Sequence, residues 1–293
     1  MVEPAVEVRG LVKTYAGTPA VDGIDLLVMR GECFALLGPN GAGKTTAIEI
    51  LEGYRAREAG EALVLGHDPG RPTRAWRNRI GIVLQTATDN AELSVHEVVS
   101  HFAHYYPAPR DTDQVIDAVG LTDKRSTRTR NLSGGQRRRL DVALGIIGRP
   151  ELLFLDEPTT GFDPEARRDF WKLIGQLRAD GTTILLTTHY LEEAEQLADR
   201  VAVIARGQIV AEGTPSALGG RATADAVVSW RTPDGVQTKK TAEPTRLVSE
   251  LAAQYDGEIP ELTIRRASLE DVYLSLVGRQ NENVSDANRV GDP

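Results

Sequence analysis

The chain has 293 residues, a formal net charge of −8 and a single cysteine. This length allows one large domain with a sizeable core plus a small second domain. The acidic balance argues against nucleic acid as the main partner, and one cysteine excludes an intramolecular disulfide, which suits a reducing cytoplasm. The sequence contains neither a signal peptide nor an apolar run of about 18 residues, so we expect no membrane-spanning segment.

The segment GPNGAGKTT matches the phosphate-binding loop G-x-x-x-x-G-K-[ST]. An apolar stretch within 28–37 precedes it and a helix-forming run at 44–51 follows, which is the strand–loop–helix context that the motif requires. Glycines let consecutive backbone N–H groups converge on phosphate oxygens, and the helix N-terminus adds a partial positive charge. The predicted nucleotide-binding residues are Gly38, Pro39, Asn40, Gly41, Ala42, Gly43, Lys44, Thr45 and Thr46.

Within this loop, two side chains have predicted roles of their own. Lys44 is expected to neutralise the β- and γ-phosphates, and the Thr45 hydroxyl is expected to ligate Mg²⁺. The alternative interpretation is a chance glycine-rich turn, which the flanking strand and helix disfavour.

A short apolar run at 152–155 ends in two carboxylates, within the segment LLFLDEPTTGFDP. Such a run predicts a fully buried parallel strand. Asp156 then stands where an acid can orient Mg²⁺, usually through water. Glu157 follows on the other side of the strand end and is the candidate general base for an attacking water. The alternative is a solvated acidic turn that caps the next helix, which the apolar run disfavours.

The run LSGGQ at 132–136 precedes a second helix-forming segment, with Ser133 placed as its N-cap. The Ser133 hydroxyl and the glycine N–H groups of this run can form a second anion-binding helix terminus. The basic cluster Arg137–Arg139 is interpreted as a solvated helix face.

With GPNGAGKTT, LSGGQ and LLFLDEP in one chain, the sequence resembles the ATP-binding-cassette (ABC) ATPases from the N-terminus to about residue 220. The resemblance implies an α/β P-loop NTPase (RecA-like) ABC nucleotide-binding domain over 1–220, with a helical signature subdomain at about 88–147. It also implies that ATP is bound between two copies of the domain. Ser133, Gly134, Gly135 and Gln136 of one copy would then contact the γ-phosphate held by the other, and Asp163 would lie in a D-loop across the dimer interface.

Three further residues receive roles only from this resemblance. His189 ends the strand-like run 182–188 and matches the switch histidine, which contacts the γ-phosphate and holds the water. Gln85 matches the Q-loop glutamine, which reaches Mg²⁺, and Tyr15 matches the aromatic residue that stacks on adenine. Unaided, we would interpret them as a structural histidine, a strand terminus and an edge-strand aromatic. His101 and His104 share a helix face, but without a third nearby ligand they do not predict a zinc site.

Three further segments make the resemblance more specific. The segments RIGIVLQ at 79–85, TTHYLEEAEQLADRVAVIARGQIVAEGTP at 187–215 and RRASLEDVYLSLVGR at 265–279 resemble the daunorubicin-resistance type of exporter ATPase. Residues 221–279 alternate strand-like and helical pieces, which predicts a small α+β domain, and Ser268 begins its last helix with a capping box. Residues 280–293 are polar and are predicted to form a disordered tail.

These features together predict an ATP-binding and ATP-hydrolysing subunit that powers a two-component exporter of drugs, antibiotics or lipid-like molecules. It would work with ATP and Mg²⁺ as a homodimer on a separate integral-membrane permease, as a cytoplasmic protein peripheral to the inner face of the cell membrane. The alternatives are a soluble ABC ATPase with a regulatory or assembly role, an importer subunit, and an ATP-gated clamp with little turnover. The sequence does not identify the cargo.

Overall fold

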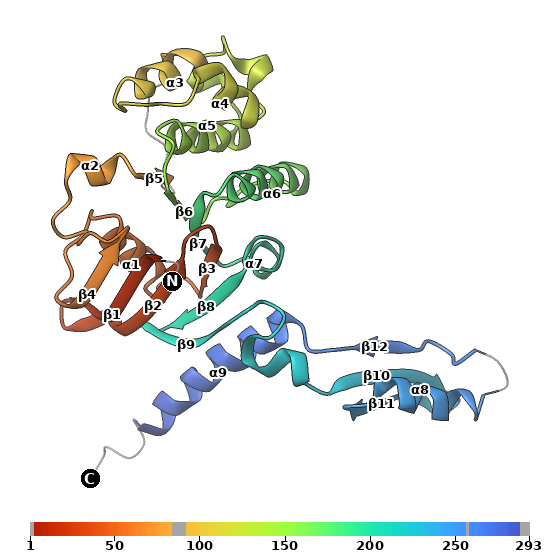
Figure 1. Cartoon of the computed structure of the whole chain (residues 1–293). Coiled ribbons are helices and arrows are strands. Elements are labelled where there is room, and N and C mark those ends of the chain that lie inside the picture. Colours follow the sequence, from red (N-terminus) through yellow and green to blue (C-terminus); the bar gives the residue numbers. More distant parts are fainter. Residues whose placement is uncertain (1–2, 84–91, 256–257, 288–293) are drawn as a thin grey trace. The chain divides into compact units, whose positions relative to one another are not determined.

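The computed structural model describes residues 3–83, 92–255 and 258–287. The chain divides into two compact units, residues 1–210 and 211–293 (Figure 1). The boundary predicted from the sequence, residue 220, falls later, inside the 3-10 helix η3 (Leu218–Thr223). Each unit is described by itself below.

The first unit is built on a six-stranded sheet in the order β5-β6-β7-β3-β8-β9. The pairs from β5 to β8 are parallel. Its strands are β3 (Cys33–Leu37), β5 (Ile80–Val83), β6 (Leu152–Asp156), β7 (Thr183–Thr188), β8 (Arg200–Ala205) and β9 (Gln208–Gly213).

Strands β3, β6 and β7 are buried at every position. Continuous apolar runs are typical of parallel strands that are covered on both faces, so the buried strands predicted in this part of the sequence are confirmed. Because the three strands are parallel neighbours, the segments that follow them emerge at one edge of the sheet. Ligands of open α/β sheets bind outside the carboxyl ends of the strands.

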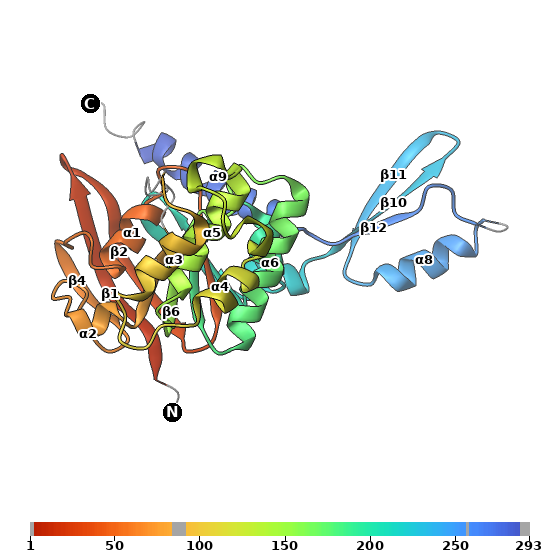
Figure 2. The same ribbon diagram turned by 90° about the horizontal axis from the view of Figure 1, so that it is seen from above.

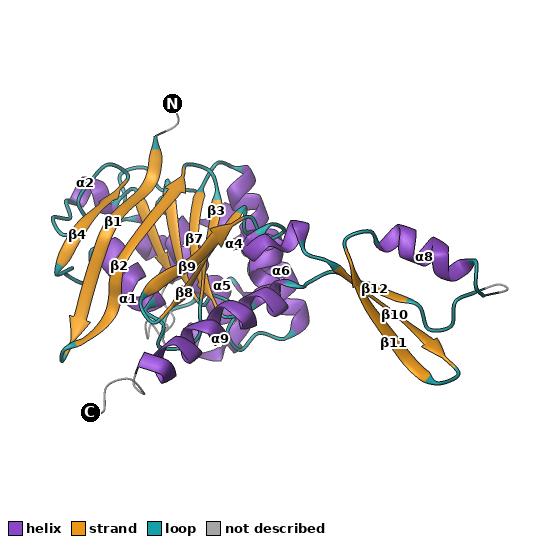
Figure 3. Ribbon diagram, turned by 90° about the horizontal axis from the view of Figure 1, so that it is seen from below, coloured by secondary structure: helices purple, strands orange, loops and turns teal. Residues whose placement is uncertain are grey.

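A second, antiparallel sheet in the order β2-β1-β4 belongs to the same unit. Its strands are β1 (Pro4–Tyr15), β2 (Thr18–Met29) and β4 (Ala59–Val64), which lie side by side in Figure 3. Its apolar residues share one core cluster with β3, β6 and the helix α1 (Lys44–Leu51). This core therefore anchors both ends of the phosphate loop.

The helical group predicted between the sheet segments consists of α3 (Val95–Ala103), α4 (Thr112–Ala118), η1 (Thr122–Lys124), η2 (Thr129–Asn131) and α5 (Gly134–Ile146). Figures 1 and 2 show α3, α4 and α5 packed together. A capping box starts α3, because the Ser94 hydroxyl accepts from Glu97 N and Ser94 N donates to the Glu97 carboxylate. The remaining helices of the unit are α2 (Arg74–Arg77), α6 (Pro164–Ala179) and α7 (Leu191–Leu197).

The second unit contains a three-stranded antiparallel sheet in the order β11-β10-β12. Its elements are β10 (Ala226–Thr232), β11 (Gly235–Thr241), α8 (Pro244–Ala252), β12 (Thr263–Arg265) and α9 (Leu269–Ala287). Helix α8 lies along one side of the strands in Figure 3, and Leu247 and Leu251 pack with Val228 in a small core. The capping box expected at Ser268 is present, closed by Asp271.

The backbone of α9 continues to Ala287, past residue 279, which is the predicted end of the second domain. Residues 288–293 lie outside the described part of the chain. Among the helices that the structure describes, none combines the length and apolarity that a bilayer crossing requires.

Phe154 offers a test of the core beneath the site. It is fully buried in β6, two positions before Asp156. We expect Phe154→Ala to lower the free energy of unfolding by about 3–5 kcal/mol, because it removes buried area and leaves a cavity. Urea unfolding followed by circular dichroism measures this. A loss below about 1 kcal/mol would show that β6 is not packed as described.

Candidate active site

The phosphate loop connects β3 to α1 by a path that only glycine permits at two positions. A Cβ on Gly38 would lie 2.4 Å from the Ile204 carbonyl oxygen, and one on Gly43 would lie 2.1 Å from the Ala20 carbonyl oxygen. Gly43 also has a φ of 107° and forms the N-cap of α1. These close approaches fix the loop against β8 and β2, so its shape is set by backbone packing.

Lys44, the first residue of α1, reaches back over this loop. Its ammonium group donates to the carbonyl oxygens of Gly38 (2.9 Å) and Pro39 (3.2 Å). The side chain is only 4% exposed. A buried cation beside the first turn of a helix, at a glycine-rich loop, is suited to bind an anion.

Thr45 and Asp156 bring two oxygen groups together at the same edge of the sheet. The Thr45 hydroxyl donates to Asp156 Oδ2 at 3.3 Å, and the Thr187 hydroxyl donates to Asp156 Oδ1. Hydroxyl and carboxylate oxygens are the donor set that Mg²⁺ prefers, so the chemistry of this pair fits such an ion.

Glu157 lies between the lysine and the histidine. Glu157 Oε1 is 3.3 Å from Lys44 Nζ, and Oε2 is 3.3 Å from His189 Nδ1, without full hydrogen-bond geometry to the ring. Its φ is 44°, a left-handed conformation that costs about 1–3 kcal/mol outside glycine. The bonds that hold it run from Glu157 N to the carbonyl and hydroxyl oxygens of Thr187, both at 3.1 Å.

The structure therefore brings together five of the residues singled out in the sequence: Lys44, Thr45, Asp156, Glu157 and His189. Burial also affects a carboxyl group that the sequence does not single out. Burial, together with the negative charges of Asp156 and Glu49, raises the pKa of Glu52 to about 8. Glu52 is the C-cap residue of α1.

Arg138 corrects the interpretation of the basic cluster as a solvated helix face. This residue of α5 is 8% exposed, and its guanidinium donates to the carbonyl oxygens of Asp156 (2.7 Å) and Pro158 (3.0 Å). Burial lowers the pKa of Arg138. Two carbonyl groups at the end of β6 need a donor, and the arginine supplies it. Arg138 therefore ties the helix that follows LSGGQ to the backbone on both sides of Glu157.

Removal of this guanidinium should be costly. We expect Arg138→Met to lower the free energy of unfolding by about 1–3 kcal/mol, because two buried carbonyl groups lose their donor. The matched variant Arg168→Met, at an exposed position of α6, should stay within about 0.5 kcal/mol of the parent. Thermal unfolding of both variants measures this, and equal losses would contradict the assigned role.

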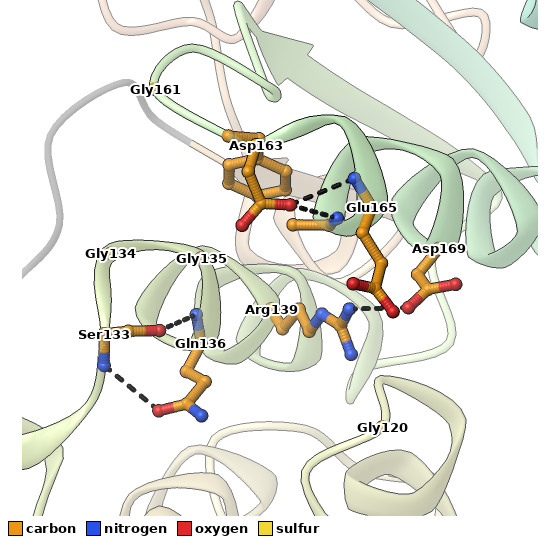
Figure 4. A pocket seen from close by; sticks show the side chains of 12 residues that line it. Gly120, Ser133, Gly134, Gly135, Gln136, Arg139, Gly161, Asp163, Glu165 and Asp169 are labelled. Atoms are coloured by element: carbon orange, nitrogen blue, oxygen red, sulfur yellow. Dashed lines mark hydrogen bonds and ion pairs between the residues drawn. The ribbon is translucent and has the colours of Figure 1, made fainter.

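Ser133, Gly134, Gly135 and Gln136 lie in a separate place, at the start of α5. In Figure 4, Ser133 Oγ accepts from Gln136 N (3.3 Å) and Ser133 N donates to Gln136 Oε1 (3.0 Å). Ser133 is therefore the N-cap, as predicted. Asp163 caps α6 and accepts from Glu165 N and Ala166 N.

These two helix starts line one open pocket of about 480 Å³ (Figure 4). The lining contains Asp163 and residues 133–136 of LSGGQ but none of the phosphate-loop residues 38–46, all of which the structure describes. Within one chain, the phosphate loop and LSGGQ thus do not line a common pocket.

The two remaining predicted residues have different outcomes. Tyr15 ends β1 and is 40% exposed, with the Arg55 guanidinium 5.3 Å and the Lys13 ammonium 5.5 Å from its ring centre. An exposed ring at that position leaves its role in adenine stacking a prediction. Gln85 lies outside the described residues.

A phosphate loop, paired carboxylates and a histidine at the carboxyl edge of a parallel sheet define a P-loop nucleoside triphosphatase. Residues 21–160 match the family model described as ABC transporter. The chain is 38% identical to the daunorubicin/doxorubicin resistance ATP-binding protein DrrA of Streptomyces peucetius, over 96% of this chain and 94% of that protein. It therefore belongs to the ABC transporter ATP-binding proteins, and it is an ATPase that hydrolyses ATP to drive transport.

Two further similarities extend over nearly the whole chain. It is 36% identical to the Nod factor export ATP-binding protein I of Paraburkholderia xenovorans, over 97% of this chain and 100% of that protein. A solved structure of the ATP binding subunit of an ABC transporter has a TM-score of 0.69 at 23% identity, covering 93% of this chain and 99% of its own. At that identity the solved structure supports the fold alone.

Proposed function

We propose that two copies of this chain close around two ATP molecules, each held between the phosphate loop of one copy and the LSGGQ segment of the other. The observation that carries this proposal is the separation of the two half-sites, since the pocket at Ser133–Gln136 contains Asp163 but no phosphate-loop residue. A helix N-terminus suits the terminal phosphate of a nucleotide presented from outside. One chain alone thus carries two incomplete sites, and a homodimer completes both.

In the closed dimer, Lys44 and the loop amides bind the β- and γ-phosphates. Mg²⁺, held by Thr45, Asp156 and Gln85, would neutralise charge on the phosphate oxygens. Glu157 accepts a proton from the attacking water while the water oxygen bonds to the γ-phosphorus and the bond to the ADP oxygen breaks. His189, at 3.3 Å from Glu157, orients the water and contacts the γ-phosphate.

The movement of the dimer acts on a separate integral-membrane permease. Closure and reopening of the dimer would drive the permease between two states. The similarity to proteins named for daunorubicin resistance and Nod factor export supports export of drugs, antibiotics or lipid-like molecules. The chain would then act as a peripheral protein on the cytoplasmic face of the cell membrane.

Inverted membrane vesicles test this proposal. Vesicles from cells that express the chain together with a candidate permease should accumulate daunorubicin when Mg-ATP is added. Quenching of daunorubicin fluorescence measures this accumulation. Vesicles with Glu157→Gln in place of the parent should not. If the chain hydrolyses ATP in solution but never co-sediments with membranes that contain the permease, a regulatory or assembly ATPase is the better interpretation.

A further inference from the structure

Glu193, in the first turn of α7, is a charged residue type in a fully buried position. Its exposed fraction is 0%, whereas the neighbouring Glu192 is exposed. Burial raises the pKa of the Glu193 carboxyl, against the opposing effect of nearby hydroxyl, indole and guanidinium groups. A buried carboxyl group is costly unless it has partners, so its surroundings indicate what it does.

The groups that face Glu193 come from three different segments of the site. They are the hydroxyls of Thr188 and Thr159, the indole N–H of Trp171 and the positive charge of Arg167. Thr188 precedes His189 directly, Thr159 lies between Glu157 and Asp163, and the other two belong to α6. The carboxyl group of Glu193 therefore interacts both with Thr188, which precedes His189, and with the segment that leads to the D-loop.

These contacts are close but not fully formed. Both Glu193 oxygens, Thr159 Oγ1 and Trp171 Nε1 are buried, and none of them reaches full hydrogen-bond geometry within the described part of the chain. Such partly satisfied groups affect the free energy of the folded state strongly, because a buried polar atom is stabilised by a full hydrogen bond and destabilised without one.

A second link joins the same two segments. The Arg167 guanidinium lies 4.6 Å from the ring centre of Tyr190, and the Tyr190 and His189 rings are 4.1 Å apart. The hydroxyl of Thr188 also accepts from Tyr190 N at 2.9 Å. Helix α6, which begins at the Asp163 cap, is thus connected to His189 through a stack of side chains as well as through Glu193.

We propose that Glu193 is a positioning residue that holds His189 and the start of α6 as one unit, so that a displacement of Asp163 at the dimer interface reaches the histidine. This inference rests on the proposed role of His189. Glu193 touches neither the nucleotide nor the water in this scheme. It acts through Thr188 on one side and through Thr159 and Trp171 on the other.

Steady-state ATPase kinetics of Glu193→Ala and Glu193→Gln test this role, with Glu192→Gln as the matched control on the same helix. We expect Glu193→Ala to lower kcat about tenfold while KM for ATP changes less than about threefold, because the nucleotide contacts remain in place. Glu193→Gln, which keeps the shape and one acceptor oxygen, should retain an intermediate kcat. Glu192→Gln should match the parent chain.

Two more measurements separate positioning from simple stability. Thr159→Val removes one partner, and its effect on kcat should be non-additive with that of Glu193→Gln, as expected for two groups in one network. If Glu193→Ala does not fold, the double-mutant cycle of Glu193→Gln and Thr159→Val decides the question alone. A lower melting temperature with parent-like kcat in every Glu193 variant would overturn the proposal. His189→Ala tests the underlying role, since parent-like kcat in that variant would remove the proposed function of the histidine itself.

Discussion

Glu157→Gln should lower kcat for ATP hydrolysis by about 10²–10⁴-fold while leaving ATP binding intact. The carboxylate lies between Lys44 and His189 at 3.3 Å from each, and it is 12% exposed on the side chain. Glutamine has the same shape and fits the same backbone conformation, but it cannot accept a proton from water. With Mg-ATP bound and not hydrolysed, the two half-sites should remain closed around the nucleotide, so the variant should become a stable dimer.

Light scattering with and without Mg-ATP, combined with a steady-state ATPase assay, measures both effects. Glu192→Gln is a suitable control because it removes one carboxylate from an exposed position nearby. Turnover at the parent rate in Glu157→Gln would refute its role as the general base. A monomer at saturating Mg-ATP would mean either that the permease is needed to assemble the sites or that the shared-site proposal is wrong. The same measurement in the presence of the permease separates these two explanations. A dimer that forms there supports the shared site, and a monomer there refutes it.

The parts of the fold that hold the site could be predicted because their signals are local. The strands at 33–37, 152–156 and 183–188 contain continuous apolar or β-branched runs, the second of which ends at Asp156, and all of their positions are buried. The phosphate loop follows one of them and opens α1, as its motif requires. The residues that end these strands meet because parallel strands present their carboxyl ends at one edge.

The residues that the sequence analysis missed depend on contacts between distant segments. Arg138 lies within a run of three arginines, and only the carbonyl groups at the end of β6 make it a buried donor. Glu193 resembles Glu192 in sequence, but it lies four positions before the buried Leu197 and next to the buried Ala194. That helical spacing was a usable signal, since positions i and i+4 share a face. The groups that meet the carboxyl could not be predicted, because they come from other elements.

Lys44→Ala should weaken ATP binding, whereas Glu157→Gln should affect hydrolysis. The ammonium group is buried and aimed across the phosphate loop, where it donates to Gly38 O and Pro39 O. A charge-assisted hydrogen bond to phosphate contributes about 1.5–3 kcal/mol, so the dissociation constant for Mg-ATP should rise about 10- to 100-fold. The free energy of unfolding should change less than the free energy of ATP binding, because the glycine contacts of the loop with β8 and β2 do not involve this side chain.

Isothermal titration calorimetry with Mg-ATP measures the affinity, with Lys124→Ala as a control that removes an exposed lysine from η1. The two variants at the site should then differ in kind. Glu157→Gln should bind ATP, dimerise and stall, whereas Lys44→Ala should fail to bind and should stay monomeric at nucleotide concentrations that saturate the parent. If Lys44→Ala binds like the parent but loses hydrolysis, the lysine acts on the transition state alone. The proposed division between binding at the loop and chemistry at the strand end would then be wrong, because both groups would serve the same step.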